Sequence, residues 1–408
     1  MNVWRTLVIL AALADTSSAL RWESCAPMPT ARMDAASAVI GDTLYVMGGR
    51  RRGGGGSGAG DQGIVNVVEA YFPAGDRWIE GFPNLPEQLA DMACAVIGER
   101  IFLFGGTTAN NTVVNSVWSW SPGDESWRVH TDTLPTPLRG AASVSPDGES
   151  ALVMGGSEVQ GGYLGSVYRF RPTSGFSVES PLLQARSSAG AGIVAGDLAI
   201  TGGYFHGPLG STEVLQEEGW GQGPALPSPR GSGLVCRDGS SLFHLGGQGT
   251  GAPLQDVLTL ASPTSEWGLL DPMITARARL AGGAVGGYLV AAGGTGPVGY
   301  EATGSCERAS LATLTSPDGE PIHASDLSVR VWPNPFSTHV EIMADLKVAT
   351  PWHVVIHGED GRRVGQWTGS STVVRVRLAP TDHLPSGLYL VTMMSGGRQT
   401  TLPLLRMR

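Results

Sequence analysis

Leu44-Tyr45-Val46-Met47-Gly48-Gly49 is the first of six short apolar runs that each end in a glycine pair. The later pairs are Gly105-Gly106, Gly155-Gly156, Gly202-Gly203, Gly246-Gly247 and Gly293-Gly294. Their first glycines are 57, 50, 47, 44 and 47 residues apart. A period of roughly 50 residues, with one strand-like run per copy and no helical periodicity, is typical of a β-propeller with one four-stranded blade per repeat. The sequence therefore predicts an all-β chain with a six-bladed propeller over residues 20–318.

A second landmark in each repeat is an aromatic residue that precedes an arginine by ten positions. The pairs are Trp22/Arg32, Phe176/Arg186, Trp220/Arg230 and Trp267/Arg277, with two extra residues in Trp127/Arg139 and with Gln88 in the arginine position after Trp78. Together with the glycine pairs, this pattern resembles the kelch repeat. We expect the aromatic residues to pack between blades.

The order of landmarks predicts how the ring closes. Five repeats run from arginine through the glycine pair to an aromatic residue, whereas the last ends at Cys306-Glu307-Arg308 without one. Trp22, near the start of the mature chain, supplies the missing residue, so the N-terminal strand should complete the last blade. Antiparallel pairing then places Cys25 beside Cys306 and predicts a disulfide between them. Cys94 and Cys236 are expected to be buried free thiols.

The N-terminus has the three parts of a secretory signal peptide. Arg5 precedes the apolar run 7–14, and the small residues Ser17-Ser18-Ala19 follow, so residues 1–19 should be removed. No other segment reaches the roughly 20 apolar residues of a membrane helix. We therefore expect a protein that does not span the membrane and is secreted or held at the cell surface.

The kelch landmarks stop before a linker at residues 319–327, and residues 328–408 alternate between apolar and polar side chains. About seven short strands, with a hairpin signal at Asp360-Gly361, predict a small β-sandwich. Two motifs in this part, 331–336 with Pro333-Asn334-Pro335 and 384–391 with Gly387 and Tyr389, resemble the type A sorting domain of the type IX secretion system. The resemblance implies that the secretion machinery is a partner. Arginine replaces the usual lysine in the tail 404–408, and a generic accessory sandwich is the alternative.

The first group of candidate binding residues consists of arginines that begin the innermost strands and should ring one mouth of the central channel. They are Arg32, Arg139, Arg186, Arg230 and Arg277. In some kelch proteins, arginines at this position hold acidic peptides, because a guanidinium matches a carboxylate. The alternative is an ion pair with a neighbouring blade, for example with Asp34 or Asp91.

The second group lies in the loops that follow the glycine pairs and emerge on the same face. It comprises Arg50, Arg51, Arg52, Tyr204, Phe205, His206 and Tyr300. Exposed arginines and aromatic residues are favoured in binding surfaces, although these loops could instead be solvated without a ligand. Both groups together would form a positive island on an acidic propeller and predict an anionic or polar ligand.

Composition argues against several other functions. Residues 20–327 carry 17 basic and 30 acidic residues, which argues against a nucleic-acid partner. Lys347 is the single lysine, which excludes a P-loop. His353 and His357 would lie roughly 13 Å apart on a strand, too far for one metal ion, and no copper cluster like that of galactose oxidase is visible. We therefore predict no metal or cofactor.

The sequence favours an exported binding module for a protein or carbohydrate ligand at the channel mouth. The alternative is a secreted carbohydrate-active enzyme with its site at the same mouth, as in the sialic-acid mutarotases, which are also exported six-kelch proteins. A histidine or a carboxylate of raised pKa at the mouth would favour the enzyme.

Overall fold

The computed structural model describes residues 20–51, 63–297, 301–311, 329–332, 340–358, 363–378, 387–395 and 398–406. The predicted signal peptide 1–19, the linker 319–327, the motif residues Pro333, Asn334 and Pro335, and the loop residues Arg52 and Tyr300 lie outside these ranges.

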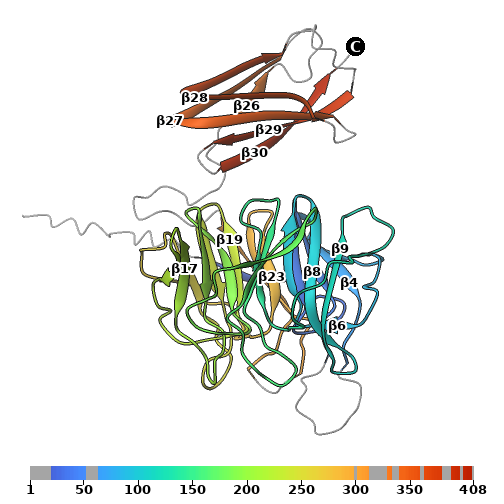
Figure 1. The fold of residues 1–408 in the computed structure, drawn as a ribbon. Coiled ribbons are helices and arrows are strands. Elements are labelled where there is room, and N and C mark those ends of the chain that lie inside the picture. Colours follow the sequence, from blue (N-terminus) through green and yellow to red (C-terminus); the bar gives the residue numbers. More distant parts are fainter. Residues whose placement is uncertain are drawn as a thin grey trace, which may run out of the picture.

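Residues 20–311 form antiparallel sheets arranged around a central axis, each built from consecutive strands (Figure 1). Blade 1 holds β2 (Ala36–Ile40), β3 (Thr43–Met47), β4 (Val68–Phe72) and β5 (Arg77–Ile79), with a short 3-10 turn at Pro73–Gly75. Blade 2 holds β6 (Leu89–Ala90), β7 (Ala93–Ile97), β8 (Arg100–Thr108), β9 (Val113–Trp120) and β10 (Arg128–Val129). Blade 3 holds β11 (Ala142–Val144), β12 (Ala151–Met154), β13 (Val167–Arg171) and β14 (Gly175–Glu179).

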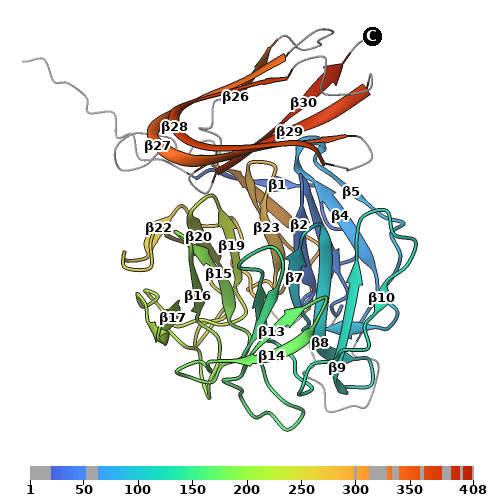
Figure 2. The same cartoon turned by 45° about the horizontal axis from the view of Figure 1, so that its top comes forward.

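Blade 4 holds β15 (Gly190–Val194), β16 (Asp197–Thr201), β17 (Thr212–Gln216) and β18 (Gly219–Gln222). Blade 5 holds β19 (Leu234–Asp238), β20 (Ser241–Leu245), β21 (Val257–Leu260) and β22 (Gly268–Leu270). The closing blade combines β23 (Ala281–Val285), β24 (Tyr288–Ala292) and β25 (Cys306–Ser310) with the N-terminal β1 (Trp22–Cys25). Figure 2 shows the innermost strands, among them β2, β7, β15, β19 and β23, around the axis.

The glycine pairs join neighbouring blades, which explains why the repeat needs glycine there. Both residues of every pair have positive φ. At Gly202 a Cβ would lie 2.4 Å from the Arg230 carbonyl oxygen, and the N–H of Gly203 donates to that same oxygen at 2.8 Å. All six pairs repeat this arrangement, and the last pair bonds to Arg32 of blade 1. A side chain at these positions would therefore both strain the backbone and separate two blades.

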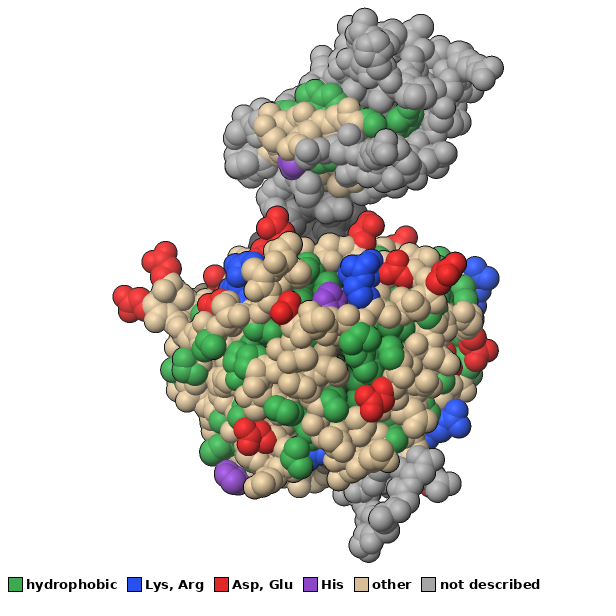
Figure 3. All heavy atoms as spheres, turned by 45° about the vertical axis from the view of Figure 1, so that its right-hand side comes forward, with side chains coloured by type: hydrophobic (Ala, Val, Ile, Leu, Met, Phe, Trp, Pro, Cys, Tyr) green, Lys and Arg blue, Asp and Glu red, His purple; other side chains and the backbone are tan. Residues whose placement is uncertain are grey.

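The aromatic landmarks pack between blades, as expected. The indole N–H of Trp127 donates to the Pro83 carbonyl, and that of Trp267 donates to the Pro224 carbonyl. The apolar core lies between blades; one cluster joins Met47 of blade 1 to Trp118 of blade 2. On the side shown in Figure 3, acidic and basic side chains are interspersed among apolar ones.

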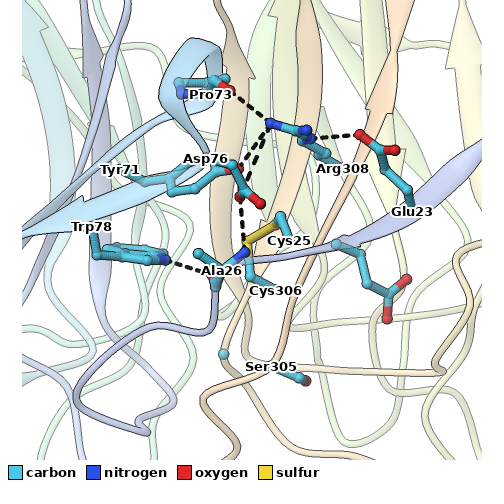
Figure 4. The surroundings of a disulfide bond; sticks show 12 residues. Glu23, Cys25, Ala26, Tyr71, Pro73, Asp76, Trp78, Ser305, Cys306 and Arg308 are labelled. Carbon is cyan, nitrogen blue, oxygen red and sulfur yellow. Dashed lines mark hydrogen bonds and ion pairs between the residues drawn. A yellow bond between two sulfur atoms is a disulfide. The ribbon is translucent and has the colours of Figure 1, made fainter.

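The predicted closure is confirmed. Strand β1 pairs antiparallel with β25, and the register sets Cys25 opposite Cys306, whose sulfur atoms form a disulfide with a Cα separation of 5.2 Å. Polar contacts with blade 1 surround this bond (Figure 4). Asp76 accepts the Ala26 N–H at 2.8 Å, and the Trp78 indole donates to the Ala26 carbonyl at 2.8 Å. The free cysteines Cys94 and Cys236 lie in innermost strands, and burial raises the pKa of each to about 12.

The C-terminal strands form a separate sheet (Figure 1). It contains β26 (Val329–Trp332), β27 (Val340–Gly358), β28 (Arg363–Leu378), β29 (Gly387–Ser395) and β30 (Arg398–Arg406). Seven short strands were expected, whereas the described residues give five, because the alternating segments 340–358 and 363–378 each run on as one long strand. Both β26 and β29 pair with β27 along different stretches of it. Gly387 begins β29, and Tyr389 in that strand is buried.

Candidate functional site

Four of the five predicted ring arginines lie inside their own blades rather than at the channel mouth. Arg32, Arg186, Arg230 and Arg277 are at most 1% exposed. Arg32 pairs with Glu69 at 2.7 Å, Arg186 with Glu213, Arg230 with Asp256 at 3.0 Å, and Arg277 with Glu307 at 2.5 Å. Each carboxylate belongs to the same blade as its arginine. The alternative, in which Asp34 or Asp91 of a neighbouring blade pairs with these arginines, is therefore wrong as well.

These ion pairs hold the loop that enters each blade. The Glu213 carboxylate also accepts the backbone N–H groups of Leu183 at 2.7 Å and Gln184 at 3.1 Å, and Glu307 does the same for Ile274 and Thr275. Burial lowers the pKa of Arg186, and the Glu213 carboxylate counteracts that effect. The pairs of Arg32, Arg186 and Arg277 are buried and therefore serve the fold, whereas the Asp256 carboxylate that pairs with Arg230 is 37% exposed.

Blades 2 and 3 fill the same positions with apolar side chains. Leu89 and Leu138 replace the arginine, since the glycine-pair N–H of the preceding blade bonds to their carbonyls. Trp118 and Tyr168 occupy the position of the carboxylate residue. In each blade this position pairs across the sheet with the residue that lies two positions before the first glycine of the glycine pair. Arg139 is therefore one residue beyond the arginine position of its blade, and it lies elsewhere than its four counterparts.

A closed ring of backbone hydrogen bonds surrounds the channel mouth. It runs through the residue two positions after each arginine position: Asp34, Asp91, Gly140, Ser188, Ser232 and Arg279. Each N–H donates to the carbonyl of the ring residue in the preceding blade at 2.6–3.1 Å, and Asp34 completes the circle by donating to Arg279. All six have φ between 51° and 61°. This left-handed conformation recurs at each junction between neighbouring sheets of the ring.

The same six residues line a cavity of about 310 Å³, together with residues of the loops after the glycine pairs. Half of the cavity is charged. Asp34 forms an ion pair with Arg50 at 3.1 Å and accepts a hydrogen bond from Arg279 at 3.2 Å, and Arg50 also pairs with Asp91. Burial, together with the nearby Asp91 carboxylate, raises the pKa of Asp34 to about 6.

The other half of the cavity is neutral except for Arg139. It is lined by Gly140, Gly161, Tyr163 and the serines Ser157, Ser187 and Ser188. Across the described part of the chain, the Arg139 guanidinium has no ion pair or hydrogen bond, and the hydroxyls of Ser157 and Ser187 have none either. This half therefore holds donors without partners.

An aromatic lip, defined here as Tyr163, Phe205 and His206, borders the neutral half. Ring centroids of Tyr163 lie 5.5 Å from Phe205 and 5.4 Å from His206, and Phe205 is 38% exposed. The lip joins the loops of blades 3 and 4, and Tyr163 also lines the cavity.

The second predicted group divides between these features. Arg50 and Tyr204 line the cavity, and Phe205 and His206 belong to the aromatic lip. Arg51, which follows Arg50 in the sequence, is exposed. Of the first group, only Arg139 lines the cavity. The expected positive island is in fact three guanidiniums beside two carboxylates. Sequence reasoning missed Arg279, Tyr163 and the serines. An alignment of the repeats at the position two residues after each arginine would have identified some of these residues.

Other chemistry is limited in the described residues. No group of three or more histidine, cysteine or acidic side chains there is arranged to hold a metal ion. His244 is buried within β20, and burial lowers its pKa to about 3. No described helix has the length and apolar character that a bilayer-spanning segment needs.

Comparison with known proteins identifies the repeat. Residues 31–81 and 88–129 match the Kelch motif. Similar curated proteins include mouse Kelch-like protein 35, 28% identical over 169 residues, and Xenopus tropicalis Kelch-like protein 25, 27% identical over 185 residues. These alignments cover 41% and 45% of this chain but 26% and 31% of the relatives, so the chain spans about a quarter to a third of their length.

A solved structure, that of YjhT, has a similar fold, with a TM-score of 0.54 at 18% identity over 62% of this chain and 88% of that one. Together with the topology and the Kelch motif matches, this likeness supports one conclusion. The larger part of the chain has a β-propeller fold, and its residues 31–81 and 88–129 carry the Kelch motif.

Proposed function

We propose that this chain is a six-bladed kelch propeller that binds a protein partner across its channel mouth. The observation that carries the proposal is the mouth cavity, in which unpartnered polar side chains lie beside the exposed aromatic lip. Polar side chains that the protein leaves unpaired remain available to a ligand, and exposed aromatic residues are favoured anchors in interfaces. The six-membered ring of backbone hydrogen bonds supports the blade number.

Exposed apolar side chains extend this surface. Val159 is 60% exposed in the loop that leads to Tyr163, and Leu183 is 58% exposed in the loop that enters blade 4. Both loops emerge on the face that bears the cavity, because strand two ends and strand one begins there. A protein surface can contact all of these loops at once, whereas the 310 Å³ cavity alone admits a single side chain or a small molecule.

Site-specific photo-crosslinking tests this proposal. A photoreactive amino acid placed at Phe205 should form a covalent adduct with a partner in the producing organism. The same group at Val178, which is 77% exposed on the outermost strand of blade 3, is the matched control and should not. Adducts of equal yield at both positions, or at Val178 alone, would contradict a mouth-face interface.

A carbohydrate-active enzyme is the second candidate, and one observation favours it. The raised pKa of Asp34 places at the mouth a carboxyl group able to exchange a proton near neutral pH. Its Oδ2 atom is already held by Arg50 and Arg279. Mutarotation of acidic and neutral sugars, followed by NMR for the wild type and Asp34→Asn, tests this candidate: anomerisation lost in the variant would replace the binding module with an enzyme.

Export completes the proposal. The signal-like segment 1–19 and the motifs around Pro333 and Tyr389 support delivery to the cell surface or medium, with the C-terminal sheet as the sorting domain. The type IX secretion machinery would then be a partner. Deleting residues 328–408 should retain the protein in the periplasm, while the N-terminus of the retained chain should still be Leu20. Normal surface delivery of the truncated chain would remove the sorting assignment.

A further inference from the structure

One corner of the mouth face, between blades 3 and 4, carries a single formal charge. It is built from the loops 157–165, 180–185 and 204–210. The Leu182 N–H donates to the Gly165 carbonyl at 2.9 Å and the ring of Tyr163 contacts that of Phe205, so the three loops touch. Glu158 is the only acidic residue in them, and they contain no lysine or arginine. It is exposed and has no ion pair within the described residues.

Glu158 lies beside the aromatic lip because one tight turn carries both. The Glu158 N–H donates to the Gly162 carbonyl at 3.0 Å, and the Gly161 N–H donates to the Glu158 carbonyl at 3.0 Å. The carboxylate lies over Gly162, where a Cβ would be 3.7 Å from Oε2 of Glu158. Tyr163 follows directly and pairs with Ser157 in an isolated β-bridge. The turn therefore holds Glu158 and Tyr163 close together, which lowers the ordering cost for a ligand that contacts both.

The loop of blade 4 fixes the other two rings of the lip. His206 has a φ of 57°, a left-handed conformation that is uncommon for a residue other than glycine. The Phe205 N–H donates across it to the Gly207 carbonyl at 2.9 Å. The ring centroids of Phe205 and His206 lie 4.7 Å apart, and both residues are exposed. Backbone outliers of this kind cluster at ligand-binding sites, which favours a function for these exposed rings.

We propose that the aromatic lip and Glu158 bind a basic side chain, arginine or lysine, of the protein partner. This inference rests on the mouth-face binding proposed above and names a residue class that the face selects. A cation is attracted to the face of an aromatic ring, and an exposed carboxylate beside it adds a modest ion pair. Val159 and Leu183, which are 60% and 58% exposed in the same loops, offer apolar surface to the methylene stem of such a side chain.

Charge favours a basic occupant over an acidic one and places it on the lip. Residues 20–327 contain 17 basic and 30 acidic residues, so the propeller as a whole attracts a basic partner surface. The mouth cavity is a poor place for the added cation, because the Arg139 guanidinium already lines it. Glu158, Phe205 and His206 lie outside the cavity lining. The basic side chain is therefore expected over the lip and not inside the cavity.

Titration of the full mature chain with N-acetyl-Gly-Arg-Gly-amide, followed by amide NMR, tests this site. We expect the resonances of Gly162, Tyr163 and Phe205 to shift. The citrulline analogue keeps the shape of arginine without its charge and should bind about fivefold more weakly. Glu158→Gln should weaken binding of the arginine peptide to a similar degree, and so should Phe205→Leu, which keeps an apolar side chain but removes the ring. Glu149→Gln is the matched control and should bind like the wild type, because Glu149 is exposed in the same blade but lies between β11 and β12, at the opposite end of the strands.

The outcomes separate this site from the broader proposal. Equal affinity for the arginine and citrulline peptides, or an unchanged affinity in either Glu158→Gln or Phe205→Leu, overturns the cation site. Tighter binding of N-acetyl-Gly-Glu-Gly-amide than of the arginine peptide at the lip overturns the choice of charge. In each of these cases a partner adduct formed through Phe205 would leave the proposed function standing. Absence of that adduct contradicts the proposed function, whatever the peptides do.

Discussion

The blade interiors and the channel mouth use arginine in opposite ways. Inside the blades, Arg32, Arg186 and Arg277 each have one buried glutamate of the same blade. At the mouth, Arg50 and Arg279 share Asp34, and Arg139 has no carboxylate among the described residues. Each interior pair matches one cation with one buried carboxylate, whereas the cavity at the mouth has one cation in excess. The difference shows that a repeated arginine marks the architecture, and that the arginine off the repeat is the better candidate for function.

Blades 2 and 3 show that the interior pair is not indispensable to a blade. Leu89 with Trp118, and Leu138 with Tyr168, occupy its place, and all four side chains are at most 8% exposed. This agrees with the general finding that a buried ion pair can be replaced by well-packed apolar side chains, although breaking one half of it is costly.

The largest expected effect comes from breaking one interior pair. Arg186→Ala leaves the buried Glu213 carboxylate without its cation and should destabilise the propeller by about 3–5 kcal/mol, measured by chemical denaturation. The double variant Arg186→Leu with Glu213→Tyr, which copies Leu138 and Tyr168 of blade 3, should recover most of that loss. A double variant no more stable than the single one would show that the two kinds of blade are not interchangeable.

A smaller loss is expected from opening the covalent closure. Replacing Cys25 and Cys306 by serine should cost about 2–4 kcal/mol, the range typical of disulfides, which is less than the roughly 5–6 kcal/mol that the chain-entropy model gives for a sequence separation of 281. The variant should still close, because Trp22 bonds to the Asp271 carbonyl and Glu23 pairs with Arg308. Limited proteolysis at the N-terminus checks this: rapid loss of β1 would show that the disulfide alone holds the strand.

The mouth should respond to pH through Asp34. Its folded pKa of about 6 lies above the ordinary value of 3.8, so the folded state takes up the proton first. The resulting stabilisation is complete below pH 4 and is lost as the pH rises through 6. The stability of the wild type relative to Asp34→Asn should therefore increase by on the order of 1–3 kcal/mol from pH 7.5 to pH 4. The exposed Asp197→Asn is the control, and a pH-independent difference for Asp34→Asn would contradict the assignment.

The smallest effect on stability is expected at Arg139. Because the guanidinium has no partner in the described residues, Arg139→Gln should change the free energy of unfolding by less than about 0.5 kcal/mol, measured alongside Arg186→Ala. The contrast between the two variants is the sharpest test of the comparison. A loss at Arg139 as large as that at Arg186 would mean that the mouth arginine is structural too.

The sequence predicted the features that local pattern controls. The glycine pairs predicted the propeller because their backbone requirement recurs in every blade, and the landmark order predicted the Cys25–Cys306 bond because one missing aromatic residue identifies the closing strand. The ring arginines were predicted to line the channel mouth, whereas four of the five are buried inside their blades. Spacing locates a residue along a strand, but the glutamate partners of Arg32 and Arg186 lie 37 and 27 residues downstream, in a third strand whose distance varies.

The mouth was less predictable for the same reason. Asp34 meets Arg279 across 245 residues, and Arg50 meets Asp91 across 41, so no local motif announces the charged half. The serines of the neutral half are common residues in loops and carry no signal individually. Only the superposition of all repeats brings these positions into one ring.

That ring has an electrostatic consequence. Its six N–H to carbonyl bonds run head to tail around the axis, so the components of their dipoles in the plane of the ring cancel by symmetry, unlike the dipoles of a helix, which add along its axis. The backbone therefore brings little field of its own to the mouth, and the six ring side chains with their neighbours determine its charge. Replacing one ring residue by another that accepts positive φ changes the charge of the channel mouth and its affinity for a ligand, while the ring of backbone hydrogen bonds is preserved.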